Sequence, residues 1–140
     1  MITDIQPRIF MELRALAVLD FSKNMITDIQ PRTFMELKAL QYLFLAGNRI
    51  SNIRSDMFFG LNSLKELNLS GNRISKLGSN GIFNNTVQPL SLDFSRNAIE
   101  TVSYDNLKEV SSLLVLNLGY NKITELEVGI FNAAINLVIL

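Results

Sequence analysis

The sequence predicts an α/β fold in the form of a curved right-handed solenoid. Its concave side would carry a parallel β-sheet, and its convex side would carry loops and short helical turns. The first observation behind this prediction is a unit of 24 residues, once 25, whose apolar positions are 1, 4, 6, 11 and 14. The clearest copy has Leu64, Leu67, Leu69, Ile74 and Leu77 at these positions, and other copies begin at Leu16, Leu40, Pro89 and Leu113. A mixed spacing of this kind buries its apolar residues only if each coil stacks on the next.

The second observation is an asparagine at position 9 of every complete unit. The column consists of Asn24, Asn48, Asn72, Asn97 and Asn121. An amide side chain has both donors and an acceptor, so it can pair with backbone groups that a turn leaves without partners. We expect the five asparagines to form a ladder of hydrogen bonds between coils.

One strand per coil follows from the apolar residues at positions 4 and 6. The expected strands are Val18–Phe21, Tyr42–Leu45, Glu66–Leu69, Ser91–Phe94 and Val115–Leu118, with a sixth beginning at Leu137. Side chains alternate along a strand, so positions 4 and 6 point into the core while positions 3, 5 and 7 face solvent. The predicted core residues are Leu19, Phe21, Leu43, Leu45, Leu67, Leu69, Leu92, Phe94, Leu116 and Leu118.

The segments that return to the next strand contain a second apolar column. It consists of Phe10, Phe34, Phe58, Phe83, Leu107 and Phe131, which we expect to stack as a spine. Prolines and glycines in these segments, such as Pro7, Pro31 and Gly78, disfavour long helices. The extra residue of the 25-residue unit lies between Leu77 and Phe83, where a surface loop can accommodate it.

We expect one domain over residues 1–140. It would contain a partial repeat (1–15), complete repeats (16–39, 40–63, 64–88, 89–112 and 113–136) and a second partial repeat (137–140). The first 16 residues match residues 25–40 at 14 positions, as either a natural duplication or an assembly from copies would produce.

These residues resemble the typical 24-residue leucine-rich repeat of extracellular proteins. The pattern L-x-x-L-x-L-x-x-N-x-I-x-x-I, with a Phe in the return, describes Leu40 to Phe58 throughout. Known members include Toll-like receptor and chaoptin-like ectodomains. The resemblance implies a module that binds a protein or glycan at the cell surface or outside the cell. Members usually carry cysteine-bearing caps, and this sequence contains no cysteine.

Composition argues against several other functions. The absence of cysteine and histidine leaves no thiol or imidazole catalyst and no zinc site of the usual kind, so we expect no enzyme, no metal and no cofactor. The 13 basic and 13 acidic residues give no net attraction to phosphate, which disfavours nucleic acid as a partner. The sequence has no run of 18 apolar residues, so we expect no membrane-spanning helix in it.

The concave face is the predicted ligand-binding surface. Its candidate residues are Tyr42, Phe44, Glu66, Asn68, Asp93 and Asn117, with the two aromatics as anchors. Plain cover of a flat sheet is the alternative interpretation of these aromatics. A basic edge beside them contains Lys23, Arg49, Arg73, Arg96 and Lys122, which either steers an acidic partner or is simply solvated.

Two further features bear on function. The sequons at Asn84 and Asn68 are candidate glycosylation sites, and a glycan on Asn68 would cover part of the concave face. The apolar segment from Leu137 to Leu140 would be an edge strand that pairs with another chain. A self-assembling scaffold that stacks through open ends is therefore the alternative function.

Overall fold

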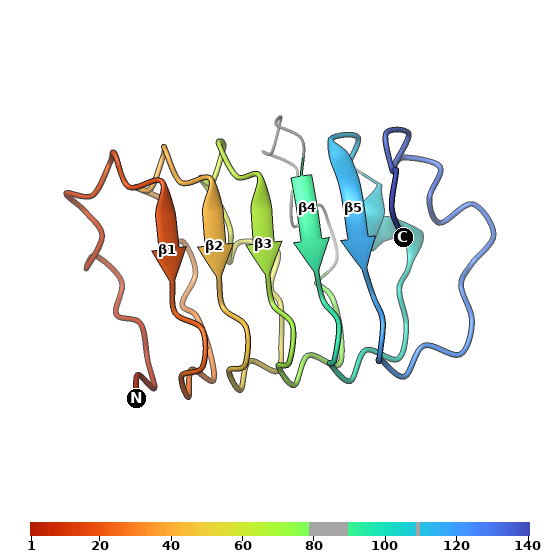
Figure 1. Ribbon diagram of the computed structural model, residues 1–140, viewed down its shortest axis with the longest axis horizontal. Coiled ribbons are helices and arrows are strands. Elements are labelled where there is room, and N and C mark those ends of the chain that lie inside the picture. The colour runs from red at the N-terminus through yellow and green to blue at the C-terminus, as the bar shows by residue number, and fades with distance from the viewer. Residues whose placement is uncertain (79–89, 109) are drawn as a thin grey trace.

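Five short strands form one parallel sheet in the computed structural model, which describes residues 1–78, 90–108 and 110–140 (Figure 1). The order in the sheet is the order in the chain, β1-β2-β3-β4-β5. All strands run in one direction, and the chain returns behind the sheet before each new strand, as Figure 1 shows. The bounds are β1 (Val18–Asp20), β2 (Tyr42–Phe44), β3 (Glu66–Asn68), β4 (Leu90–Asp93) and β5 (Leu113–Asn117).

The predicted strands are confirmed, with small shifts of their ends. Each strand ends one residue earlier than predicted. After β1 to β4 the following residue still bonds to the next coil; the N–H of Phe21, for example, donates to the Phe44 carbonyl at 2.8 Å. Strands β4 and β5 also begin earlier, at Leu90 and Leu113, with an irregularity between Leu90 and Ser91. The predicted sixth strand is reduced to an isolated bridge between Ile139 and Val115.

The side chains at positions 4 and 6 make the core as predicted, except in the outer coils. Leu19, Phe21 and Leu118 are only half-buried, whereas the predicted core residues of the inner coils are buried. An inner coil is covered on both sides, but an outer coil is covered on one side, which explains the difference. The buried set is Leu43, Leu45, Leu67, Leu69, Leu92, Phe94 and Leu116.

A column of rings lies behind the sheet. The ring centroids of Phe10 and Phe34 are 5.8 Å apart, and those of Phe34 and Phe58 are 6.5 Å apart with nearly parallel planes. Leu107 continues the column as a buried residue, and Phe131 is half-buried at its end. Phe83 lies outside the described residues. Aromatic pairs at these separations attract each other beyond the area that they bury.

The return segments are extended or turned, as the prolines predict. Within the described ranges, helix is confined to α1 (Tyr104–Leu107), and short hydrogen-bonded turns serve elsewhere. The side chain of Asn106 in α1 donates to the carbonyl of Gly78 at 2.9 Å and so joins two coils. The loop expected to hold the extra residue lies mostly at positions outside the described residues.

Candidate recognition surface

The register of the sheet arranges its solvent-facing side chains in two rows. The six predicted ligand residues all belong to these rows, two to the first and four to the second. The first row is Val18, Tyr42, Glu66, Ser91 and Val115, and the second row is Asp20, Phe44, Asn68, Asp93 and Asn117. Side chains from five coils therefore lie on one continuous face.

Four members of the second row hold the turn that follows their own strand. In each case the side-chain oxygen accepts the backbone N–H two residues further on, over 2.8–3.0 Å, which is an Asx turn. The residues are Asp20, Asn68, Asp93 and Asn117. Three of the predicted ligand residues thus have a structural role, which the recurrent Asp/Asn-x-Ser/Gly triplet could have revealed.

Phe44 is the exception in this row. It occupies the position of the four turn-forming residues, but its ring has no acceptor for the N–H of Ala46. A position that elsewhere stabilises the turn here presents an aromatic ring on the sheet. The fold therefore gives no local reason for the choice of phenylalanine.

The two aromatics are less exposed than the sequence suggests. Tyr42 and Phe44 are both half-buried, because neighbouring strands on either side cover part of each ring. Tyr42 lies beside Val18 and Glu66, and Phe44 lies beside Asp20. Aromatic rings with a polar rim of this kind are typical anchors of protein interfaces.

The pKa of the Asp20 carboxyl is lowered from its usual 3.8. The main cause is the hydrogen bond from the backbone N–H of Ser22, and a hydrogen bond from the Ser22 side chain adds to it. Because these bonds favour the ionised form, the turn after β1 gains stability above the ordinary pKa. This gain is lost as the pH falls through the lowered pKa, and it is small because Asp20 is exposed.

The asparagine column joins consecutive coils by hydrogen bonds of the amide groups, through both the oxygen and the nitrogen in Asn48, Asn72, Asn97 and Asn121 and through the oxygen alone in Asn24. The Asn72 oxygen accepts the N–H of Ile50 at 3.1 Å, and its nitrogen donates to the carbonyls of Leu45 at 2.9 Å and Leu69 at 3.0 Å. The oxygens of Asn24, Asn48, Asn97 and Asn121 likewise accept an N–H of the coil before. Each strand end is thereby fixed to its neighbours, which sets the curvature and spacing of the face.

The residues of the basic edge are all exposed and follow the strands in two sets. Lys23 and Arg96 stand at position 8 of the repeat, where the backbone is left-handed. Arg49, Arg73 and Lys122 stand at position 10, and the N–H of each donates to a carbonyl of the preceding coil. Each of the five comes shortly after the end of a strand, and the strands are parallel, so all five lie along one margin of the sheet.

Tyr120 is a candidate residue that sequence analysis missed. It is 79% exposed, and the guanidinium carbon of Arg96 lies 4.7 Å from the centre of its ring. Both residues have a positive φ at position 8, where two inner coils have Gly47 and Gly71. A tyrosine in a position that favours glycine is the sequence signal that could have identified it.

Of the two predicted glycosylation sites, the structure describes only Asn68. Asn84 lies outside the described residues. Asn68 lies on the concave face, half-buried, and its oxygen accepts both the N–H and the hydroxyl of Ser70. Its amide nitrogen, the atom that a glycan would modify, makes no hydrogen bond in the described structure.

Two kinds of site are not found among the described residues. No three acidic side chains there come together in a way that could hold a metal ion. No helix in the same ranges is long and apolar enough to cross a membrane. Asp20 and Asp93 lie on strands β1 and β4, with β2 and β3 between them.

Comparison with solved structures gives close matches of fold. A crystal structure of TLR13 in complex with ssRNA13 superposes with a TM-score of 0.88 at 31% identity, over 99% of this chain and 19% of that one. The Toll–Spätzle complex of Drosophila superposes with a TM-score of 0.68 at 28% identity, over 76% of this chain and 15% of that one. A leucine-rich repeat protein of Leptospira interrogans superposes with a TM-score of 0.77 at 28% identity, over 91% of this chain and 31% of that one.

The chain thus spans between about a seventh and a third of the length of these solved proteins. A search of curated proteins by sequence gave no match. The profile of the leucine rich repeat family matches residues 1–50 and 43–94, which together cover more than half of the chain. With its asparagine ladder and parallel sheet, the chain belongs to the leucine-rich repeat family and forms a solenoid of the Toll-like receptor type.

Proposed function

We propose that this chain is a protein-interaction module of an extracellular receptor or adhesion ectodomain. It binds a protein or glycan ligand through the concave face, with Tyr42 and Phe44 as anchors. The mechanism is surface complementarity on a rigid scaffold, and the chain performs no catalysis. Binding of this kind needs side chains that the fold itself does not require.

The observation that carries the proposal is the aromatic ring of Phe44 in a row of turn-forming residues. Asp20 and Asn68, its neighbours in the sheet, each hold a backbone N–H, while Phe44 holds none. Tyr42 lies two residues before it on the same strand and faces the same side. Two adjacent rings on a rigid strand lose little conformational freedom on binding, which favours their use as anchors.

The similar structures support both the class of function and the location. Toll is solved with Spätzle and TLR13 with ssRNA13, so solenoids of this type present surfaces to macromolecular ligands. For this chain we favour protein or glycan over nucleic acid, because basic and acidic residues are equal in number. Lys23, Arg49, Arg73, Arg96 and Lys122 would orient an acidic partner along one margin of the face.

A glycan on Asn68 is incompatible with this use of the sheet. Asn68 and Phe44 are paired across β2 and β3, so a sugar there would cover the anchor. We therefore expect the binding form to be unmodified at Asn68.

The test is to screen the chain, fused to an Fc fragment, against arrays of extracellular proteins, glycans and single-stranded RNA. The affinity for the ligand found is then measured for the double variant Tyr42→Ala/Phe44→Ala. Loss of two anchor rings is expected to weaken binding by at least about 2 kcal/mol, or some thirtyfold. The matched control is Val18→Ala, which removes an exposed side chain from the same row as Tyr42.

A second variant separates binding from folding. Phe44→Asn gives this coil the same type of residue that forms the turn in the other coils, so it is expected to fold with a stability within about 1 kcal/mol of the parent. Its binding is nevertheless expected to be lost. Unchanged affinity of either variant would remove the aromatics as anchors, and preferential capture of RNA would overturn the choice of ligand class.

A further inference from the structure

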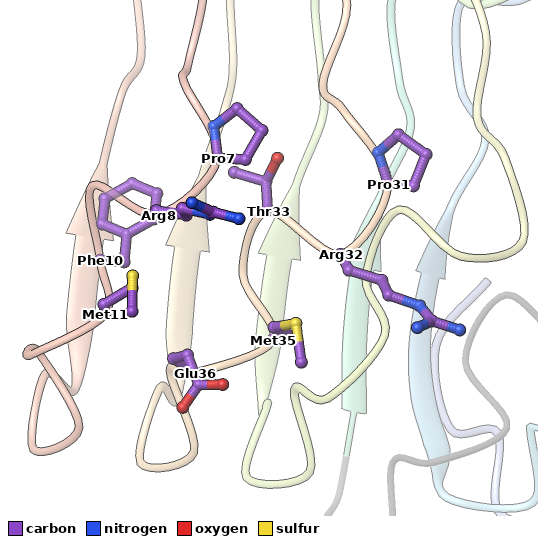
Figure 2. A pocket seen from close by; sticks show the side chains of 9 residues that line it. All are labelled: Pro7, Arg8, Phe10, Met11, Pro31, Arg32, Thr33, Met35 and Glu36. Carbon is purple, nitrogen blue, oxygen red and sulfur yellow. The ribbon is translucent and has the colours of Figure 1, made fainter.

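A groove of about 260 Å³ lies on the convex side, between the two nearly identical segments at the start of the chain. Figure 2 shows its lining residues, among them Arg8, Phe10 and Met11 from one coil and Met35 and Glu36 from the next. None of these residues belongs to the concave face. The volume is below the roughly 300–1,000 Å³ of pockets for drug-sized ligands, and it suits a single side chain.

The next pair of coils shows what normally fills this place. The guanidinium carbon of Arg32 lies 5.3 Å from the centre of the Phe59 ring. A shift of one 24-residue repeat places Arg8 where Arg32 stands and Met35 where Phe59 stands. The groove therefore has an arginine, Arg8, equivalent to Arg32, but it has a methionine, Met35, where the next pair of coils has the ring of Phe59.

The two pairs of coils differ at a position where the second pair has a glycine. A Cβ atom on Gly60 would lie 2.9 Å from the main chain of Met35, so these two coils are in close backbone contact. The residue one repeat earlier is Glu36, whose side chain lines the groove with Met11. The first two coils therefore have a full side chain at the groove where the next pair has only a glycine.

The backbone of Arg8 is held ready for this role. Arg8 and Arg32 follow Pro7 and Pro31 and have φ values of 81° and 59°, a region in which turns favour glycine or asparagine. Figure 2 shows the Arg8 side chain extending from its coil toward Thr33 of the next, while Arg32 extends away from the groove. An arginine kept in this strained conformation is best explained by what its guanidinium covers.

We propose that this groove binds an aromatic side chain of a partner protein. The ring lies beneath the Arg8 guanidinium and between Met11 and Met35, in the arrangement that Phe59 has beneath Arg32. The cation attracts the face of the ring, and the two thioethers make favourable contacts with it. The convex side thereby supplies a second contact, independent of the concave face.

A nucleobase is the other planar group that could enter. An aromatic side chain of a protein is favoured over a nucleobase, because the molecule fills its own equivalent site with phenylalanine.

The experiment is saturation-transfer NMR of the 140-residue chain with N-acetyl-phenylalaninamide as probe. The matched aliphatic probe is N-acetyl-leucinamide, and adenosine represents a nucleobase. We expect the phenyl probe to bind most tightly. Met35→Phe, which supplies the missing ring from within, is expected to weaken its binding at least tenfold, while Met35→Leu leaves it within twofold.

Arg8→Gln tests the cation without touching the interior. It is expected to weaken binding of the phenyl probe by about two- to fivefold. This variant tests the proposal even if Met35→Phe does not fold. Thermal unfolding of each variant reports folding. Undiminished binding to folded Met35→Phe, unchanged binding to Arg8→Gln, equal binding of the aliphatic probe or tighter binding of adenosine would each overturn the proposal.

Discussion

At the residue scale, a single ladder asparagine hydrogen-bonds to the backbone of two coils at once. Asn72 is 8% exposed and bonds to backbone groups of its own coil and of the coil before it. Its removal leaves the N–H of Ile50 and the carbonyls of Leu45 and Leu69 without these partners in a site that water cannot easily reach. Buried polar groups without partners are costly.

We therefore expect Asn72→Ala to lower the free energy of unfolding by about 1–3 kcal/mol. Urea denaturation followed by circular dichroism measures this. The control is Asn62→Ala, an exposed asparagine of the preceding coil, which is expected to change stability by less than about 0.5 kcal/mol. Equal effects of the two substitutions would show that the ladder adds nothing to stability.

Position 8 of the repeat shows a different use of single residues. All five coils have a left-handed backbone there, yet three of them use Lys23, Arg96 and Tyr120 in place of glycine. A left-handed L-residue costs about 1–2 kcal/mol, which the Arg96–Tyr120 contact offsets in part. Two of these strained residues, Lys23 and Arg96, belong to the exposed basic edge, and Tyr120 contacts Arg96, which fits a role in contact with a partner.

At the element scale, one coil is stable only through the fit of its neighbours. Gly60 illustrates this, because its φ of 92° disfavours any side chain and an added Cβ would also meet the main chain of Met35. Gly47 shares the positive φ, but the nearest atoms to its added Cβ lie 3.7 Å away. The two glycines therefore separate backbone strain from collision between coils.

Gly60→Ala is expected to destabilise the fold by about 2–4 kcal/mol, the sum of a strained φ and a displaced coil. Gly47→Ala, which has the strain alone, is expected to cost about 1 kcal/mol. Chemical denaturation of both variants in parallel gives the comparison. A Gly60→Ala variant no less stable than Gly47→Ala would contradict the close packing of the second and third coils.

At the scale of the whole molecule, a solenoid of 140 residues exposes apolar side chains at both ends. Val138 and Leu140 are 76% and 64% exposed beside the bridge formed by Ile139, and Met1 and Ile9 are exposed at the other end. Open apolar coils with free strand edges favour association with another chain. This supports the alternative proposal of a stacking scaffold for the chain in isolation.

Sedimentation velocity of the isolated chain is expected to show a size that increases with concentration in the micromolar range. Lysines at Val138 and Leu140 are expected to abolish this increase, because they place like charges at the contact. A lysine at the exposed Thr124 serves as the control and is expected to leave association intact. A stable monomer for the parent chain would refute the stacking proposal.

Much of the fold could be predicted because every coil has apolar residues at the same positions and must bury them in the same way. Leucines at positions 4 and 6 can be buried only by a neighbouring strand, so the strands, their parallel order and the stacked rings of Phe10, Phe34 and Phe58 followed from spacing. The five asparagines were recognisable because they recur. The spacing of the repeat is therefore enough to predict the strands, their order, the column of rings and the asparagine ladder.

What only the tertiary structure decided concerns places where coils differ from one another. The spacing predicts that Asp93 and Asn117 face solvent, but their hydrogen bonds to their own turns appear only when the backbone is folded. The groove at Arg8 depends on Met35 and Glu36 standing opposite another coil 24 residues away. A repeat pattern determines what all coils share, whereas function depends on contacts between unlike side chains that only stacking brings together.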